Sequence, residues 1–136
     1  MKMKTSTRYV SDYVYEAANE NGNKVRIDMQ APDEKQGMSP MEMVLSALSG
    51  CAVVEVVLML KKKRKQVIDI SVETEGERNE DHPKKFISLH SHYTLISPDT
   101  STEDLEKVVR LALEKYCSVA SSLNVPVTFS TTIKSA

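Results

Sequence analysis

Apolar residues alternate with polar ones in several stretches of this 136-residue chain, and the alternation is typical of strands with one face in water. Five segments are predicted to be strands: 25–29, 68–72, 87–95 and 127–133 have this pattern, and 9–15 has it more weakly. Two further segments, 39–65 and 105–123, have the apolar content or the 3.6-residue period of helices. The order ββαββαβ, with short connections that favour antiparallel pairing, predicts an α+β fold. We expect one domain over residues 1–136, with helices packed on an antiparallel sheet.

The long apolar segment 43–60 fits either a membrane span or a buried helix. Basic residues follow it at 61–65, as they do after a span with a positive flank. Glu55 lies inside the segment, however, where a carboxylate costs roughly 2.5 to 3.5 kcal/mol to place in lipid. Ser39 and Glu42 also have the spacing of a capping box, which starts a helix in a soluble protein. We therefore predict a central helix buried by protein on every side, and no membrane contact.

Each predicted helix holds one of the two cysteines, Cys51 and Cys117. The second helix is predicted to begin at a capping box formed by Thr100 and Glu103 and to end at Asn124. Two thiols on different helices suit a redox pair, in which one thiolate attacks oxygen and the other thiol resolves the sulfenic acid. Free cysteines are also common as small buried hydrophobes, so spacing alone leaves both interpretations open.

Composition excludes several other classes of function. Eighteen Lys and Arg residues against 19 Asp and Glu give a net charge of −1, which provides no general attraction for nucleic acid. The cysteines form no CxxC pair, and His90 and His92 share the polar face of a predicted strand, so we expect no metal and no other cofactor. The first residues lack the apolar core of a signal peptide, which predicts a cytoplasmic protein.

Two longer motifs resemble those of a known family. The run GMSPMEMVLSALSGC, which ends at Cys51, and the run EKYCSVASSL around Cys117 resemble the two cysteine motifs of the OsmC/Ohr family. The resemblance covers essentially the whole chain and is closest to the less characterised OsmC-like branch. It implies an intertwined homodimer in which sheets of both chains enclose the central helices. It also implies a thiol-dependent peroxidase for organic hydroperoxides, with Cys51 as the peroxidatic cysteine, Cys117 as the resolving cysteine and an external dithiol as reductant.

The resemblance further implies an arginine that polarises the thiolate and a glutamate that orients this arginine. Glu42 is the candidate glutamate, although it lies one position later than in the hydroperoxide resistance proteins and the capping box also explains it. Glu55, one helical turn after Cys51, is an alternative acid. Arg26 and Arg8 are the candidate arginines, and the sequence does not choose between them.

Two functions of different classes follow from these residues. The first is the peroxidase, which would serve in oxidative stress defence. The second is a non-catalytic dimer of the same fold that binds an apolar small molecule in its interfacial cleft, with cysteines that only fill space. Loss of free thiol on addition of an organic hydroperoxide distinguishes the two.

Overall fold

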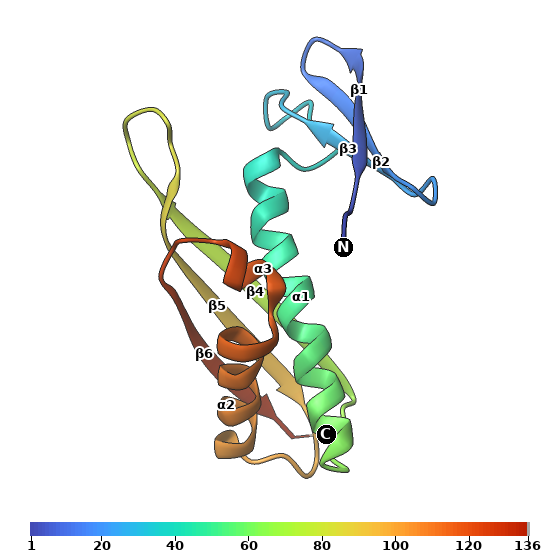
Figure 1. The fold of residues 1–136 in the computed structure, drawn as a ribbon. Helices are drawn as coiled ribbons and strands as arrows, with labels where there is room; N and C mark the ends of the chain where they lie inside the picture. The colour runs from blue at the N-terminus through green and yellow to red at the C-terminus, as the bar shows by residue number, and fades with distance from the viewer. Residues whose placement is uncertain (136) are drawn as a thin grey trace. The chain divides into compact units, whose positions relative to one another are not determined.

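The computed structural model describes residues 1–135, which fold as two compact units, Met1–Val44 and the described residues from Leu45 onward. Figure 1 shows the order of the elements, three strands, a long helix, two strands, a helical segment and a last strand. The α+β class predicted from the sequence is confirmed. The described residues form six strands rather than five, because the predicted strand 9–15 is a hairpin.

The first unit contains the sheet β1-β2-β3, in which both neighbouring pairs are antiparallel. Its strands are β1 (Thr5–Ser11), β2 (Val14–Asn19) and β3 (Lys24–Asp28). The turn between β1 and β2 contains only two residues, and Ser11 pairs directly with Val14. Apolar residues stand close on both sides of so short a turn, so the hydrophobic pattern does not show where one strand ends.

Asp28, the last residue of β3, is completely buried and organises the loop that follows. Its carboxylate accepts hydrogen bonds from the backbone N–H groups of Gln36, at 2.9 Å, and Gln30, at 3.0 Å. It also accepts from Arg26 Nε at 3.1 Å and, more weakly, from the Gln30 side chain. The backbone N–H of Gln36, followed by the other donors, holds the pKa of Asp28 far below its ordinary value, although burial opposes this.

The central helix α1 (Pro40–Lys62) begins with the capping box predicted from the sequence. The backbone N–H of Ser39 donates to Glu42 Oε1 at 2.9 Å, and the Glu42 N–H donates to Ser39 Oγ at 3.3 Å. Lys35 forms an ion pair with the same carboxylate. This ion pair, with the bonds from Ser39, lowers the pKa of Glu42 to about 2. The start of α1 is therefore fixed by local interactions.

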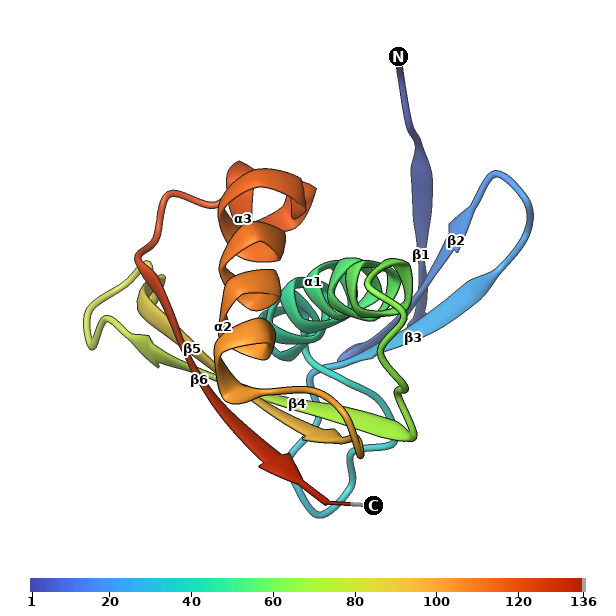
Figure 2. The same ribbon diagram turned by 90° about the horizontal axis from the view of Figure 1, so that it is seen from below.

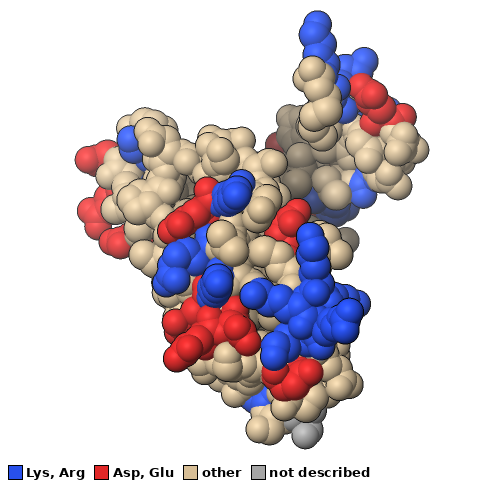
Figure 3. Space-filling view, turned by 60° about the horizontal axis from the view of Figure 1, so that its bottom comes forward, with Lys and Arg blue, Asp and Glu red and all other residues tan. Residues whose placement is uncertain are grey.

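Basic residues end α1 and continue beyond it, as predicted. Arg64 adopts a left-handed backbone, with φ of 62°, and the next N–H, that of Lys65, donates to the carbonyl of Leu60. The Lys65 ammonium lies 3.8 Å from the carboxylate of Asp104. Figure 3 shows a patch of Lys and Arg side chains with Asp and Glu side chains beside it. The end of a helix and the ion pair of Lys65 with Asp104 account for this basic run.

The second unit contains a mixed sheet with the order β4-β5-β6. Its strands are β4 (Asp69–Arg78), β5 (Phe86–Ile96) and β6 (Val127–Lys134). The pair β4–β5 is antiparallel as predicted, but β6 runs parallel to β5, with Leu89 opposite Val127 and Tyr93 opposite Thr131. The prediction of a wholly antiparallel sheet is wrong at this edge. A helical segment lies between β5 and β6, and such a crossover returns the chain in the same direction.

Two helices cover one face of this sheet (Figure 2): α2 (Thr102–Leu111) and the part of α1 that belongs to the second unit. The core between them contains fully buried residues from all three elements: Leu48, Ala52, Val56 and Leu60 of α1, Leu105, Val108 and Val109 of α2, and Tyr93 and Leu95 of β5. On another side of α1, Val54 and Leu58 are each 56% exposed. The helix that we predicted to be buried on every side is thus buried on one side within a single chain.

By length and composition α1 is the only helix in the described chain that is apolar enough to cross a membrane. Core helices of soluble proteins meet the same criteria. The second predicted helix begins one residue later than expected, because Ser101 caps α2 by accepting from the Asp104 N–H at 3.1 Å. Thr100, the predicted cap, instead bonds through its hydroxyl to Ser97 at 2.8 Å.

Candidate active site

The helical segment after α2 is broken, and the break positions Cys117. A π-helical turn (Ala112–Tyr116) follows α2, and it closes with a hydrogen bond of 2.7 Å from the Cys117 N–H to the carbonyl of Ala112. Cys117 itself has an extended backbone, with φ of −77° and ψ of 104°. The single helix predicted over 105–123 is therefore wrong, since three helical pieces occupy that range.

Cys117 caps the short helix α3 (Ser118–Ser122). Its sulfur accepts a hydrogen bond from the backbone N–H of Ala120 at 3.3 Å. The N-cap position brings the thiol close to the free N–H groups of the next helical turn. Cysteine is not among the usual capping residues, so the sequence carried no signal for this geometry.

The break brings Cys117 to Cys51, which lies in the middle of α1 and is half-buried. The thiol of Cys117 donates a hydrogen bond to the sulfur of Cys51. The backbone N–H groups of Val119 and Ser118 donate to the same sulfur. The Val119 N–H has the largest influence on the pKa of Cys51. The two residues selected from the sequence as a redox pair are therefore neighbours within one unit of the chain.

These donors give Cys51 an activated thiol. The Val119 N–H, and then the Cys117 thiol and the Ser118 N–H, lower the pKa of Cys51, because each stabilises a thiolate more than a thiol. Burial and the negative charge of Glu55 act in the opposite direction and are outweighed. No arginine is among the main contributions to the pKa of Cys51 within the described chain.

Cys117 has the opposite character. It is 2% exposed, and burial raises the pKa of its thiol above the ordinary value. The hydrogen bond that it donates to Cys51 raises it further, since donation requires the proton. Of the two thiols, that of Cys51 is thus the more easily deprotonated, which is the order that a nucleophile and a resolving partner need.

Other sequence candidates have structural partners. Glu42 is engaged by Ser39 and Lys35 at the start of α1. Arg26 is bonded to the buried Asp28. Arg8 lies on the exposed strand β1, opposite Glu16 of β2. The sequence made each of these residues a candidate for a place beside the thiol, whereas the contacts described for each one lie within the first unit.

Hydroxyl groups bonded to one another lie between α1 and the sheet, and that of Ser91 is fully buried. Ser49 of α1 is 2.6 Å from the hydroxyl of Thr74 in β4, which is 2.7 Å from that of Ser91 in β5. Ser49 also donates to the carbonyl of Leu45 at 3.1 Å. Tyr93, two residues after Ser91 on the same face, is fully buried and has no hydrogen-bond partner for its hydroxyl. It is the one buried side-chain N or O atom in residues 1–135 that lacks a partner.

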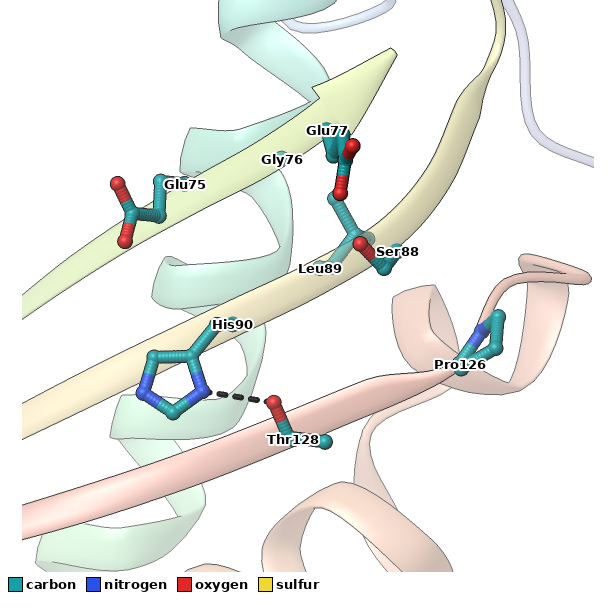
Figure 4. A pocket seen from close by; sticks show the side chains of 8 residues that line it. All are labelled: Glu75, Gly76, Glu77, Ser88, Leu89, His90, Pro126 and Thr128. Atoms are coloured by element: carbon teal, nitrogen blue, oxygen red, sulfur yellow. Dashed lines mark hydrogen bonds between the residues drawn. The ribbon is translucent and has the colours of Figure 1, made fainter. Parts of the chain in front are cut away.

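The other face of the sheet is polar and lacks the cysteines. His90 hydrogen-bonds with Thr128 and Ser130 of β6, and His92 bonds with Ser130 and Thr132, at 2.6 to 3.0 Å. A hollow of about 410 Å³ opens beside His90. Figure 4 shows the side chains that line it. Residues 1–135 contain no group of three or more His, Cys, Asp or Glu side chains that could hold a metal ion. The solvated face predicted for the two histidines agrees with this arrangement.

The fold is thus a mixed sheet covered on one face by helices, and two cysteines from different helical segments meet there. These features define the class as an α+β protein with a pair of neighbouring thiols. The family model described as OsmC-like protein matches residues 32–132, so the chain belongs to the OsmC family. Protein YhfA of Escherichia coli K12 is 33% identical over 121 residues, which are 89% of each chain.

Solved structures have the same fold. An OsmC-like protein from Mycoplasma pneumoniae superimposes with a TM-score of 0.84 at 16% identity, over 98% of this chain and 97% of that one. The organic hydroperoxide resistance protein OhrB of Bacillus subtilis gives a TM-score of 0.66 at 15% identity, over 97% and 98%. The OsmC/Ohr resemblance inferred from the two cysteine motifs is confirmed.

Proposed function

We propose that this protein is a thiol-dependent peroxidase that reduces organic hydroperoxides. The observation that carries the proposal is the pairing of Cys51, whose pKa is lowered, with Cys117, whose pKa is raised. Cys51 Sγ attacks the terminal oxygen of the hydroperoxide and forms an S–O bond. The O–O bond breaks, the alkoxide takes a proton and leaves as the alcohol, and Cys51 becomes a sulfenic acid.

Cys117 resolves this intermediate. Its sulfur bonds to Cys51 Sγ, the S–O bond breaks, and the proton lost by the Cys117 thiol leaves with the hydroxyl group as water. The disulfide is then reduced by an external dithiol through two thiol–disulfide exchanges. A polar hollow of about 280 Å³ borders Cys117 and gives such a reductant a place to approach; its other lining residues are Lys115, Tyr116, Ser118, Ser121 and Ser122.

The functional form in this proposal is a cytoplasmic homodimer. Val54 and Leu58 leave an apolar strip exposed on α1, and Gly50, one turn before Val54, has no atom near the position of an added Cβ. Burying two such side chains against a second copy of the chain stabilises the dimer, because exposed apolar surface leaves water. A monomeric mass in light scattering at micromolar concentration contradicts this assembly.

Backbone N–H groups activate Cys51 in the proposed mechanism, and Glu42 acts as the residue that fixes the start of α1. The catalytic role that the family resemblance implies for Glu42 has a direct test. Glu42→Gln keeps the size of the side chain and removes its charge. A fall in peroxidase rate at unchanged thermal stability supports a catalytic Glu42, whereas a fall in stability with an unchanged rate supports a structural role through the ion pair with Lys35.

Cysteine variants test the peroxidase. We expect reduced protein to lose free thiols on addition of cumene hydroperoxide, and Cys51→Ser to lower peroxide consumption to the level of buffer with reductant alone. Cys117→Ser keeps the first reduction, traps Cys51 as a sulfenic acid and stops turnover as Cys51 overoxidises. Peroxide consumption that is the same in wild type and Cys51→Ser would falsify the proposal.

The exposed apolar strip on α1 also favours the second candidate, a non-catalytic dimer that binds an apolar small molecule. In that case the thiols remain unchanged in cumene hydroperoxide, while an environment-sensitive apolar dye binds equally to wild type and to Cys51→Ser. The two candidates thus give opposite results in the same thiol titration.

A further inference from the structure

Three hydroxyl groups connect α1 to the strands β4 and β5. Ser49 of α1 lies 2.6 Å from the hydroxyl of Thr74, which lies 2.7 Å from that of Ser91, its direct partner on β5. Ser49 also donates to the carbonyl of Leu45 at 3.1 Å. A hydroxyl group has one proton, so these contacts exist together only if Ser91 donates to Thr74 and Thr74 donates to Ser49. We call Ser91, Thr74 and Ser49 the hydroxyl chain.

The apolar residues of α1 do not by themselves select one rotation of the helix about its axis. Val54 and Leu58 are exposed on one side of α1, although they are as apolar as the row that is fully buried: Leu48, Ala52, Val56 and Leu60. Hydrophobic burial depends on the apolar area removed from water, so different rotations can bury similar areas. Glu55, the only polar residue between Cys51 and Leu60, excludes only those rotations that would bury its carboxylate.

The hydroxyl chain supplies a polar contact that forms at one rotation. Ser91 is completely buried, and Thr74 and Ser49 are half-buried, so water has limited access to all three groups. A rotation that moves Ser49 away leaves the Thr74 proton without this acceptor and brings an apolar side chain against it. A single buried polar contact selects one register of an apolar helix interface in the same way in coiled coils.

The rotation of α1 also determines where Cys51 lies. Cys51 follows Ser49 by two residues on the same helix, so the two side chains move together when the helix turns. A rotation of about 30° moves an atom at the helix surface, about 5 Å from the axis, by about 2.5 Å. The Cβ atoms of a disulfide lie about 3.5–4.5 Å apart, so a displacement of this size is enough to prevent a bond between Cys51 and Cys117.

We infer that the hydroxyl chain fixes α1 at the rotation in which Cys51 meets Cys117. The three residues are positioning residues, because their side chains bond to one another and to the carbonyl of Leu45, and not to either sulfur. The inference rests on the proposed function, in which these two thiols must form a disulfide. The hydroxyl chain takes no part in that chemistry and gives up no proton in it.

The first test replaces the hydroxyl chain with apolar residues of the same size, in the triple variant Ser49→Ala, Thr74→Val, Ser91→Ala. The melting temperature should be unchanged or higher, because no hydroxyl is left without its partner. We then measure the equilibrium of the Cys51–Cys117 disulfide with reduced and oxidised dithiothreitol, without peroxide. We expect the equilibrium constant for disulfide formation to fall about three- to tenfold, since the preference for one rotation amounts to about one hydrogen bond.

A matched control removes hydroxyl groups from the opposite face of the same sheet. Ser130 and Thr132 of β6 bond to His92 on the polar face. The double variant Ser130→Ala, Thr132→Val makes the same chemical changes there and should leave the disulfide equilibrium unchanged. Ser49→Ala alone removes the one member of the hydroxyl chain that belongs to α1, and it should weaken the disulfide in the same direction as the triple variant.

The second test observes α1 directly in the reduced protein. In ¹H–¹⁵N spectra we expect one sharp set of amide signals for residues 48–60 in wild type and in the control. In the triple variant, these signals should be doubled or broadened, because the helix exchanges among several rotations.

Each outcome supports or overturns the inference. An unchanged disulfide equilibrium in the triple variant overturns it, whatever the melting temperature, and so does a single sharp set of signals from α1. If the triple variant does not fold, the same two measurements on Ser49→Ala decide. Failure of the proposed function looks different: wild-type protein then forms no disulfide with oxidised dithiothreitol, and the α1 signals still report whether the hydroxyl chain fixes the rotation.

Discussion

Asp28 and Tyr93 are both completely buried polar residues, and they differ in how their polar atoms are satisfied. The carboxylate of Asp28 accepts four hydrogen bonds and organises the loop after β3. The hydroxyl of Tyr93 has no partner among the described residues, which costs about 1–3 kcal/mol for a typical buried group. The comparison shows that a buried polar group has a different effect when its hydrogen bonds are satisfied than when they are not. A saturated buried group stabilises the structure, whereas an unsatisfied one opposes folding.

Replacement of Asp28 should have the largest effect. Asp28→Ala leaves the N–H groups of Gln30 and Gln36 without their acceptor, so the loop after β3 should lose its order. We expect amide hydrogen exchange at these two residues to become at least about tenfold faster. Asp33→Ala, at an exposed position of the same loop, is the control and should leave both rates unchanged. Equal protection in the Asp28→Ala and wild-type proteins would show that Asp28 does not organise the loop.

The next largest effect should come from acid, which weakens the stabilisation that the hydrogen-bonded carboxylates provide. The pKa values of Asp28 and Glu42 are lowered from ordinary values of 3.8 and 4.5, the latter to about 2. Their stabilisation is therefore complete above those ordinary values and is lost as the pH falls through the lowered pKa values. The urea concentration at the midpoint of unfolding, followed by circular dichroism, should decrease as the pH is lowered from about 4.5 towards 2. In Glu42→Gln this fall should be smaller, and an equally steep fall would exclude Glu42 as a contributor.

The smallest effect concerns the charge near the reactive pair. Glu55 raises the pKa of Cys51, so Glu55→Gln should lower this pKa and increase the thiolate fraction at neutral pH. Alkylation by iodoacetamide at pH 7 should become about two- to fivefold faster for Cys51, as expected for one partly screened charge. Glu106→Gln, on the exposed side of α2, is the control. A slower reaction would mean that Glu55 supports the thiolate, as a residue that orients a cation would do.

The sequence predicted those parts of the fold that depend on local interactions. The capping box of Ser39 and Glu42 lies within one helical turn, so its spacing was sufficient to place the start of α1. Alternation located β4 and β5, because exposed and less exposed residues alternate along both strands. It did not show the two-residue turn after Ser11 or the parallel pairing of β6, since direction depends on how the chain crosses the sheet.

The candidate site was predicted only in part. The motifs around Cys51 and Cys117 identified the pair, but not the π-helical turn that brings the thiols together, because apolar spacing continued through Ala112–Tyr116. The expected arginine was sought by residue type, whereas backbone N–H groups activate Cys51, and every residue except proline has one. Tyr93 was assigned to the apolar face of a strand. Its unpaired hydroxyl depends on the positions of neighbouring atoms, which a hydrophobic pattern does not contain.

The sulfur that caps α3 gives the molecule a built-in spectroscopic reporter. The Ala120 N–H donates to Cys117 Sγ, and a thiolate, a thiol and a disulfide sulfur accept hydrogen bonds with different strengths. The proton chemical shift of this one backbone amide should therefore differ among the chemical states of Cys117. An ¹⁵N-labelled sample would display the state of the pair in real time, inside cells as well as in solution, with no dye and no trapping reagent.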